Sequence, residues 1–190
     1  MSSNNGSANG KLVIISGPSG SGKTTICKEL TKDPKVRASI SVTTRPPRSQ
    51  EVDGKDYYFV SEREFERKIK KGFFIEHARY SGTLYGTPRK PLENALEEGL
   101  IYLLEIDVQG ALQIMGKYPD AISVFILPPG KDVLKKRLAG RNTDKEPDIN
   151  NRLNIAENEL QSSSHYKYRV TNDNLKEAVN EIRNILGFKK

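Results

Sequence analysis

The chain has 190 residues, one cysteine, two histidines and a formal net charge of +7. This length fits one domain with a proper core, and the cysteine and histidine counts exclude a disulfide framework and a metal site built from thiolates or imidazoles. Much of the Lys and Arg alternates with Glu and Asp, without a dense basic run, so the charge indicates solubility and phosphate binding and not a nucleic-acid partner.

The first ten residues are small and polar, and we expect them to be disordered. They contain no apolar segment typical of a secretory signal, and no apolar run of the chain approaches the length of a membrane span. We therefore expect a cytoplasmic protein without a membrane partner.

The first predicted strand, residues 12–15, leads directly into "GPSGSGKT" at 17–24, which fits the pattern G-x-x-x-x-G-K-[ST]. Glycines let backbone N–H groups approach a phosphate chain, Lys23 can reach the outer phosphates, and the Thr24 hydroxyl can hold Mg²⁺. The alternative is an unimportant glycine-rich turn. The strand before the motif and the predicted helix 23–30 after it disfavour that alternative, because a helix turns its positive N-terminal end toward an anion.

Residues 41–90 are rich in Tyr, Thr, Arg, Gly and Pro and predict an inserted, mixed and partly antiparallel subdomain. Its strands are "DYYFV" and "FFIEHARY", with the helical "SEREFERKIKKG" between them. In "SVTTRPPR" two prolines impose an extended turn, so Arg45 and Arg48 should point the same way and suit a phosphate dianion. A proline-rich surface loop with two solvated arginines is the alternative.

Glu76 lies between apolar residues in "FIEHARY". A carboxylate that accepts two parallel hydrogen bonds would match the N1–H and N2–H₂ edge of guanine, whereas adenine has an unprotonated N1 there. For this residue alone, a buried structural glutamate is the simpler interpretation. Tyr57 and the segment 81–87 add hydroxyl groups, and Thr87 before Pro88 also predicts a helix N-cap.

The apolar run 102–107 ends in Glu105 and Asp107, and a period of two puts both carboxylates on one face. They stand at the carboxyl end of the strand, where open α/β sheets bind ligands. "DVQG" also fits the D-x-x-G pattern of GTPases, but the chain has no N-K-x-D run, which disfavours a GTPase. The alternation predicts a parallel sheet covered by helices. Its further strands are 121–127 and 168–170, and its helices are 91–98, 131–139 and 175–186.

Residues 137–165 are polar and rich in Arg and Asn, and we expect them to form a mobile helical flap over a site. Arg137 and Arg141 are four residues apart, so a helix would align them. They are either a solvated basic helix face or arginines that a closing flap brings to a transferring phosphoryl group.

Five segments, in this order and spacing, resemble guanylate kinase: "ISGPSGSGKTT", "SVTTRPPRSQEVDGKDYYFV", "FIEHARYSGTLYGTP", "LLEIDVQGA" and "RLAGRNTD…NNRL". The resemblance runs over residues 11–187 and implies an α/β fold in three parts. These are a P-loop parallel-sheet core flanked by helices (11–40, 91–136 and 166–187), an inserted mixed GMP-binding subdomain (41–90) and a helical lid (137–165). It implies an ATP:GMP phosphotransferase of purine nucleotide metabolism that also accepts dGMP, uses Mg²⁺ and is a monomer or weak homo-oligomer.

Carried over by position, the resemblance implies four groups of site residues. The transferring phosphoryl group would be stabilised by Lys23, Arg137, Arg141 and Arg152. ATP would be bound by Gly17, Pro18, Ser19, Gly20, Ser21, Gly22, Lys23, Thr24 and Thr25, with Asn172 near the adenine. Guanine would be read by Ser41, Glu76, Thr87 and Asp107. The GMP phosphate would be held by Arg45, Arg48, Tyr57 and Tyr85, with Gly86 in the same site.

One departure and one alternative accompany this resemblance. Family members usually carry Gly where Asn142 stands, so the lid hinge is expected to be stiffer here, without loss of activity. The alternative is a non-catalytic guanylate-kinase-like scaffold that binds phosphorylated peptides. An intact P-loop together with the lid arginines disfavours the scaffold.

Overall fold

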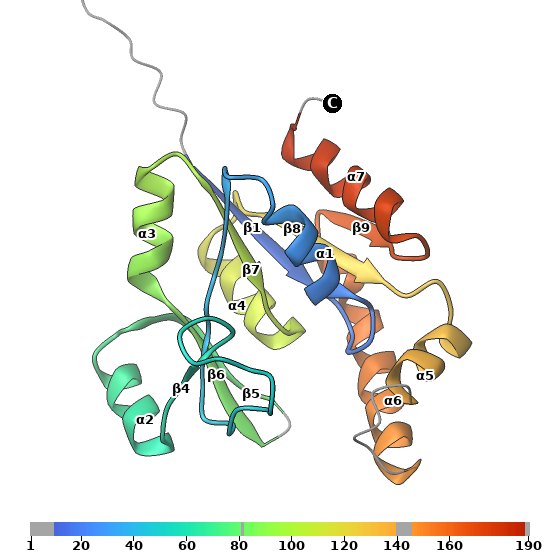
Figure 1. Ribbon diagram of the computed structural model, residues 1–190, viewed down its shortest axis with the longest axis horizontal. Coiled ribbons are helices and arrows are strands. Elements are labelled where there is room, and N and C mark those ends of the chain that lie inside the picture. The colour runs from blue at the N-terminus through green and yellow to red at the C-terminus, as the bar shows by residue number, and fades with distance from the viewer. Residues whose placement is uncertain (1–9, 81, 140–145, 189–190) are drawn as a thin grey trace, which may run out of the picture.

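A five-stranded parallel sheet forms the centre of the computed structural model, which describes residues 10–80, 82–139 and 146–188 (Figure 1). Its strands are buried on both faces, as in "KLVIIS", where every residue after Lys11 is buried; this is typical of parallel sheets covered by helices. The α/β class predicted from the alternation of elements is therefore confirmed. In sheet order the strands are β2 (Val36–Ala38), β7 (Ile101–Glu105), β1 (Lys11–Ser16), β8 (Ile122–Leu127) and β9 (Tyr168–Thr171).

Helices cover both faces of this sheet (Figure 1). One apolar cluster includes Leu92, Ala95 and Ile114, and the other includes Ile26 and Ile182. The three- and four-residue spacing of apolar side chains near the C-terminus thus does face the core, as predicted. The first cluster holds α3 (Arg89–Glu97) and α4 (Val108–Lys117), and the second holds α1 (Lys23–Leu30) and α7 (Leu175–Leu186).

A second, four-stranded sheet is built from the residues between β2 and α3, and it has its own small core of Val42, Phe65 and Phe74. β3 runs parallel to β4 but antiparallel to β6, and β6 is antiparallel to β5, so the predicted mixed sheet is found. The bounds 41–90 for this subdomain stay a prediction. In sheet order the strands are β4 (Tyr58–Phe59), β3 (Val42–Thr43), β6 (Thr83–Pro88) and β5 (Phe74–Tyr80), and the helix is α2 (Glu62–Lys70).

Two helices and a short 3-10 turn lie where the lid was predicted: α5 (Lys131–Ala139), α6 (Glu146–Gln161) and η1 (Ser162–His165). Leu134 and Leu138 of α5 pack on Ala156 of α6 in a small core of their own. Arg141 and Asn142 lie outside the described residues, and so does the side chain of Arg152, so their predicted roles stay predictions. In the described part of the chain, no helix is both long and apolar enough to cross a membrane.

Two local predictions are wrong, the first because of a helix cap and the second because of a tertiary contact. β7 ends at Glu105 and not at residue 107, because Asp107 caps α4 by accepting a hydrogen bond from the backbone N–H of Gly110 at 2.9 Å. Thr87 is not the N-cap of α3; that position is occupied by Pro88, which makes no side-chain cap. Thr87 belongs to β6, and its hydroxyl is turned toward a buried carboxylate instead.

Candidate active site

One cleft of about 260 Å³ joins the glycine-rich loop, the second sheet and α6. Its walls come from segments far apart in the sequence, since β1, β7 and β5 all end at it. Most of the predicted site residues that the structure describes therefore meet in a single space. The lining residues are Gly17, Ser19, Gly20, Gly22, Lys23, Thr24, Thr25, Ser41, Arg48, Tyr57, Glu76, Tyr80, Tyr85, Glu105, Ile106, Asp107 and Glu159.

The glycine-rich loop is shaped by close packing from outside it. Gly20 has φ of +85°, and a Cβ there would lie 3.1 Å from Leu134 and 3.3 Å from Leu138, so the lid helix α5 rests directly on the loop. The ammonium of Lys23 donates to the carbonyls of Gly17 at 2.6 Å and Pro18 at 3.0 Å. Because α1 begins at Lys23, the loop amides and the positive end of the helix dipole face the same cleft.

Asn172 and Arg137 lie behind this loop and not among the residues that line the cleft. The buried amide of Asn172 donates to the carbonyl of Ser21 at 2.8 Å and would collide with any side chain at Gly22. Arg137 donates to the backbone carbonyl of Asn172 at 3.1 Å. Its other terminal nitrogen, Nη1, is buried and has no hydrogen-bond partner among the described residues. Both side chains thus brace the loop, while their predicted contacts with adenine and phosphoryl stay predictions.

At the carboxyl end of β7, the hydroxyl of Thr24 donates to the Glu105 carboxylate at 2.5 Å. The two residues are 81 positions apart in the sequence and meet because β1 pairs with β7. Among the described residues no group of three or more His, Cys, Asp or Glu is arranged to hold a metal ion. A hydroxyl and a carboxylate are the oxygen donors that a hard divalent cation prefers.

Glu76 is the buried acid of the cleft, with 4% of its surface exposed. The hydroxyl of Thr87 donates to its Oε1 at 2.5 Å, and a Cβ on Gly110 would lie 2.8 Å from its Oε2. Burial, with a smaller contribution from the charge of Asp107, raises the pKa of Glu76 to about 7, against the lowering effect of the Thr87 hydrogen bond. Lys117 of α4 ties this strand to the core by donating to the carbonyl of Ile75 at 2.7 Å.

The predicted arginine pair meets an acid that the sequence analysis missed. Arg45 forms a two-point ion pair with Glu51, at 2.7 and 2.9 Å. The backbone N–H of Arg48 also donates to this carboxylate at 2.8 Å, but the guanidinium of Arg48 comes only within 3.9 Å of it and is 70% exposed. Arg48 lines the cleft and Arg45 does not. Burial raises the pKa of Tyr57 to about 12, so its hydroxyl keeps its proton near neutral pH; the ring of Tyr85 stands edge-on 6.1 Å away.

Two further polar residues of the cleft were missed, Tyr80 at the end of β5 and Glu159 on α6, as was the apolar Ile106 after β7. Nothing local distinguished them, since Tyr80 is one of 8 tyrosines and Glu159 one of several acids on a polar helix. Of the predicted residues, some lie beside the cleft without lining it. They are Pro18, Ser21, Arg45, Gly86, Thr87, Arg137 and Asn172.

Comparison with known proteins gives the family. The sequence model described as guanylate kinase matches residues 9–188, nearly the whole chain. The chain belongs to the guanylate kinase family. It is 45% identical over 181 residues to a guanylate kinase of Clostridium tetani, covering 95% of this chain and 87% of that protein. It is 47% identical over 182 residues to one of Caldanaerobacter subterraneus subsp. tengcongensis, covering 95% and 88%.

Solved structures agree with this guanylate kinase assignment. The crystal structure of guanylate kinase from Anaplasma phagocytophilum matches with a TM-score of 0.81 and 35% identity, over 95% of this chain and 86% of that one. Shikimate kinase from Bacteroides thetaiotaomicron matches at 0.52 with 15% identity, over 94% and 99%, and this likeness concerns the fold alone. As a member of the guanylate kinase family the chain is an enzyme, a nucleoside-monophosphate kinase.

Proposed function

We propose that the protein transfers the γ-phosphoryl group of ATP to GMP or dGMP, giving ADP and GDP or dGDP. The observation that carries this proposal is the single cleft in which a phosphate loop and a buried, partly protonated carboxylate face each other. The loop, with Lys23, supplies amides and a cation for the donor phosphates. The second sheet supplies Glu76 for the acceptor base and Arg48 and Tyr57 for the acceptor phosphate.

Base recognition follows from the surroundings of Glu76. Its Oε1 already accepts from Thr87, which fixes the plane of the carboxylate, and guanine would add donors at N1 and N2. Hydrogen bonds to the charged form lower a pKa, so guanine would convert the half-protonated acid into a carboxylate. Adenine has no proton at N1 and would leave a buried polar group unpaired, which costs about 1–3 kcal/mol. Ser41 and Asp107 line the same cleft and would complete the base site.

Transfer needs no general base, because a phosphate monoester with a second pKa near 6 is largely a dianion at neutral pH. The task is to bring two polyanions together in line, which requires positive charge and exclusion of water. Lys23 and Arg48 line the cleft, and we include Arg137, Arg141 and Arg152 of the lid as phosphoryl-stabilising residues. The hydroxyls of Tyr57 and Tyr85 would donate to the acceptor phosphate.

Magnesium is the cofactor that this site suits. Thr24 and Glu105 would hold it, and the remaining ligands would come from nucleotide phosphates and water. When bound, the ion neutralises negative charge on the phosphoryl group that is transferred and on the phosphates of the ADP that leaves.

The biological setting completes the proposal. We infer that the protein is a cytoplasmic enzyme of purine nucleotide metabolism, a monomer or weak homo-oligomer without a nucleic-acid or membrane partner. The scaffold alternative is not favoured, because the relatives across the whole chain are named guanylate kinases and the phosphate loop is intact.

The test is a coupled assay of ADP formation with ATP, Mg²⁺ and each of GMP, dGMP, AMP, CMP and UMP. We expect turnover of GMP and dGMP, and a kcat/KM for AMP that is lower by about 10⁴-fold. Turnover of AMP as fast as GMP would contradict the assignment of the base site. No turnover of any nucleotide, with tight binding of a phosphorylated peptide, would favour the scaffold.

A further inference from the structure

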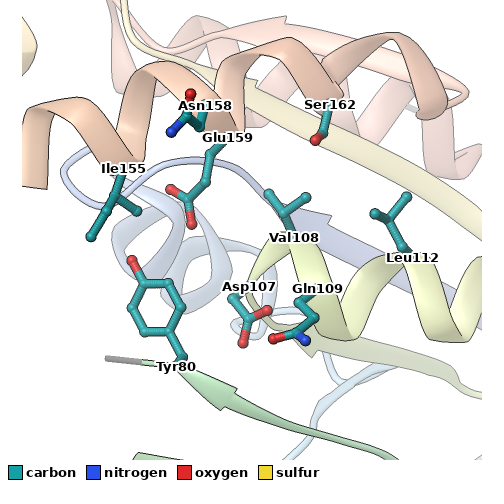
Figure 2. A pocket seen from close by; sticks show the side chains of 9 residues that line it. All are labelled: Tyr80, Asp107, Val108, Gln109, Leu112, Ile155, Asn158, Glu159 and Ser162. Carbon is teal, nitrogen blue, oxygen red and sulfur yellow. The ribbon is translucent and has the colours of Figure 1, made fainter. Parts of the chain in front are cut away.

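Glu159 is the one acid of the lid that lines the nucleotide cleft in the described part of the chain. It lies in the last turns of α6 and also lines a neighbouring hollow together with Tyr80, Asp107 and Ile155. Figure 2 shows its carboxylate and the Tyr80 hydroxyl pointing toward each other, below the helix that carries Glu159. The side chain therefore bridges the lid and the end of β5.

The surroundings of this carboxylate are those of a bound anion. The backbone of Ser19 in the phosphate loop and the hydroxyl of Tyr80 hydrogen-bond to it, and the charge of Lys23 attracts it. Burial is the larger influence, and with the charge of Asp107 it raises the pKa of Glu159 to about 7. Its second oxygen, Oε2, is buried without a hydrogen-bond partner among the described residues.

The lid does not depend on this side chain for its packing. α6 is held on α5 by Leu138, Leu153 and Ala156, and Leu160 packs on the main core. A buried oxygen without a partner costs free energy, so the inward position of Glu159 opposes stability at that atom. Its presence in the cleft therefore calls for an explanation other than support of the helix.

We propose that the Glu159 carboxylate competes with the phosphates of the donor nucleotide for the phosphate loop and thereby sets the affinity for that nucleotide. The proposal rests on the proposed function, which assigns ATP to this loop. A carboxylate and a phosphate need the same partners, a loop amide and the Lys23 ammonium, and two anions at one cation repel each other. Donor phosphates must then displace Glu159, and the apparent affinity falls by the fraction of molecules in which the carboxylate holds the loop.

The experiment compares Glu159→Gln with Glu157→Gln in the full-length protein. Glu157 lies on the same helix, is half exposed and pairs with Lys131 at 2.8 Å, so its replacement makes the same change of charge away from the loop. The affinity of each protein for ADP, and separately for GMP, is measured by calorimetric titration. The buffer is at pH 8, so that Glu159 is ionised in the wild type. Tyr80→Phe serves as a second variant, because it removes a hydrogen bond that holds the carboxylate in place.

Glu159→Gln should bind ADP about tenfold more tightly, since it removes a charged competitor, while GMP affinity changes less. Tyr80→Phe should tighten ADP binding in the same direction, and Glu157→Gln should match the wild type. Unchanged or weaker ADP binding by Glu159→Gln would overturn the proposal. An equal increase in the affinity for ADP and for GMP would overturn it as well. ADP titration does not depend on turnover, so failure of the proposed reaction would be visible separately, as absent GMP phosphorylation by the wild type.

Discussion

Replacing Glu76 by Gln should raise stability at alkaline pH while it lowers activity toward GMP. The amide has nearly the same shape and keeps an oxygen for Thr87, which donates to Oε1 at 2.5 Å. It removes a negative charge from a site that is 4% exposed. Stability and activity should therefore change in opposite directions, which is typical of a polar group retained for function.

The size of the stability change follows from the pKa. Burial raises the pKa of Glu76 from 4.5 to about 7, so the folded protein binds this proton more tightly than the unfolded chain does. The resulting stability is present below pH 4.5 and is lost as the pH rises through 7, about 3 kcal/mol in all. Gln does not titrate. The stability of Glu76→Gln relative to wild type should therefore increase by roughly 2–3 kcal/mol between pH 5 and pH 8.

The loss of activity follows from the hydrogen bonds. An amide N–H would face a guanine N–H in place of a carboxylate oxygen, and hydrogen bonds to charged groups contribute about 1.5–3 kcal/mol. The value of kcat/KM for GMP should fall by about 10–10²-fold. The GMP-to-AMP ratio should narrow, because the rotated amide offers adenine N1 a donor.

Two measurements test this prediction. Urea unfolding of both proteins at pH 5 and pH 8 gives the stability difference, and kcat/KM for GMP and AMP gives the specificity. Parallel pH dependence of the two stabilities would refute the raised pKa. An unchanged GMP-to-AMP ratio would show that this carboxylate is structural and that guanine is read elsewhere.

Three further substitutions separate the parts of the site. Lys23→Ala should lower kcat by about 10²–10³-fold with an unchanged circular dichroism spectrum, and more than a tenth of wild-type kcat would exclude the loop as the catalytic site. Arg48→Ala should raise KM for GMP and leave KM for ATP unchanged, whereas an equal rise in both would remove it from the acceptor side. Gly110→Ala should raise KM for GMP, because its Cβ would lie 2.8 Å from Oε2 of Glu76. Gly116→Ala, in the same helix with open space around it, is the control, and equal KM values for the two would contradict the close contact.

The features that the sequence determined are those that depend on interactions between residues close together in the chain. The phosphate loop is eight consecutive residues, and its backbone depends on glycines placed where a side chain would not fit. The helix 175–186 was predicted to the residue, because its apolar spacing, its Asn174 cap and the Gly187 that ends it are all neighbours in sequence. The parallel sheet followed from alternating apolar runs.

Local signals failed where a distant group needed a partner. Thr87 before Pro88 looks like a helix cap, yet its hydroxyl donates to Glu76 on the neighbouring strand, because a buried carboxylate without donors is more costly than an uncapped helix. Asp107 is a different case: it was predicted to extend the strand, but it caps α4 by accepting from Gly110, only three positions away, so one local signal prevailed over another. In both cases the side chain was noticed correctly, and its surroundings decided what it does.

Contacts between distant segments were decided by the tertiary structure alone. Asn172 meets Ser21 across 151 positions because β9 and β8 carry it to the back of the loop. Glu159 is partly buried beside Ser19, while Glu157, two residues earlier on the same helix, is half exposed. The two glutamates are chemically identical and share one polar segment, so no local pattern separates them. Only the way α6 packs on α5 and over the loop turns one of them into the cleft.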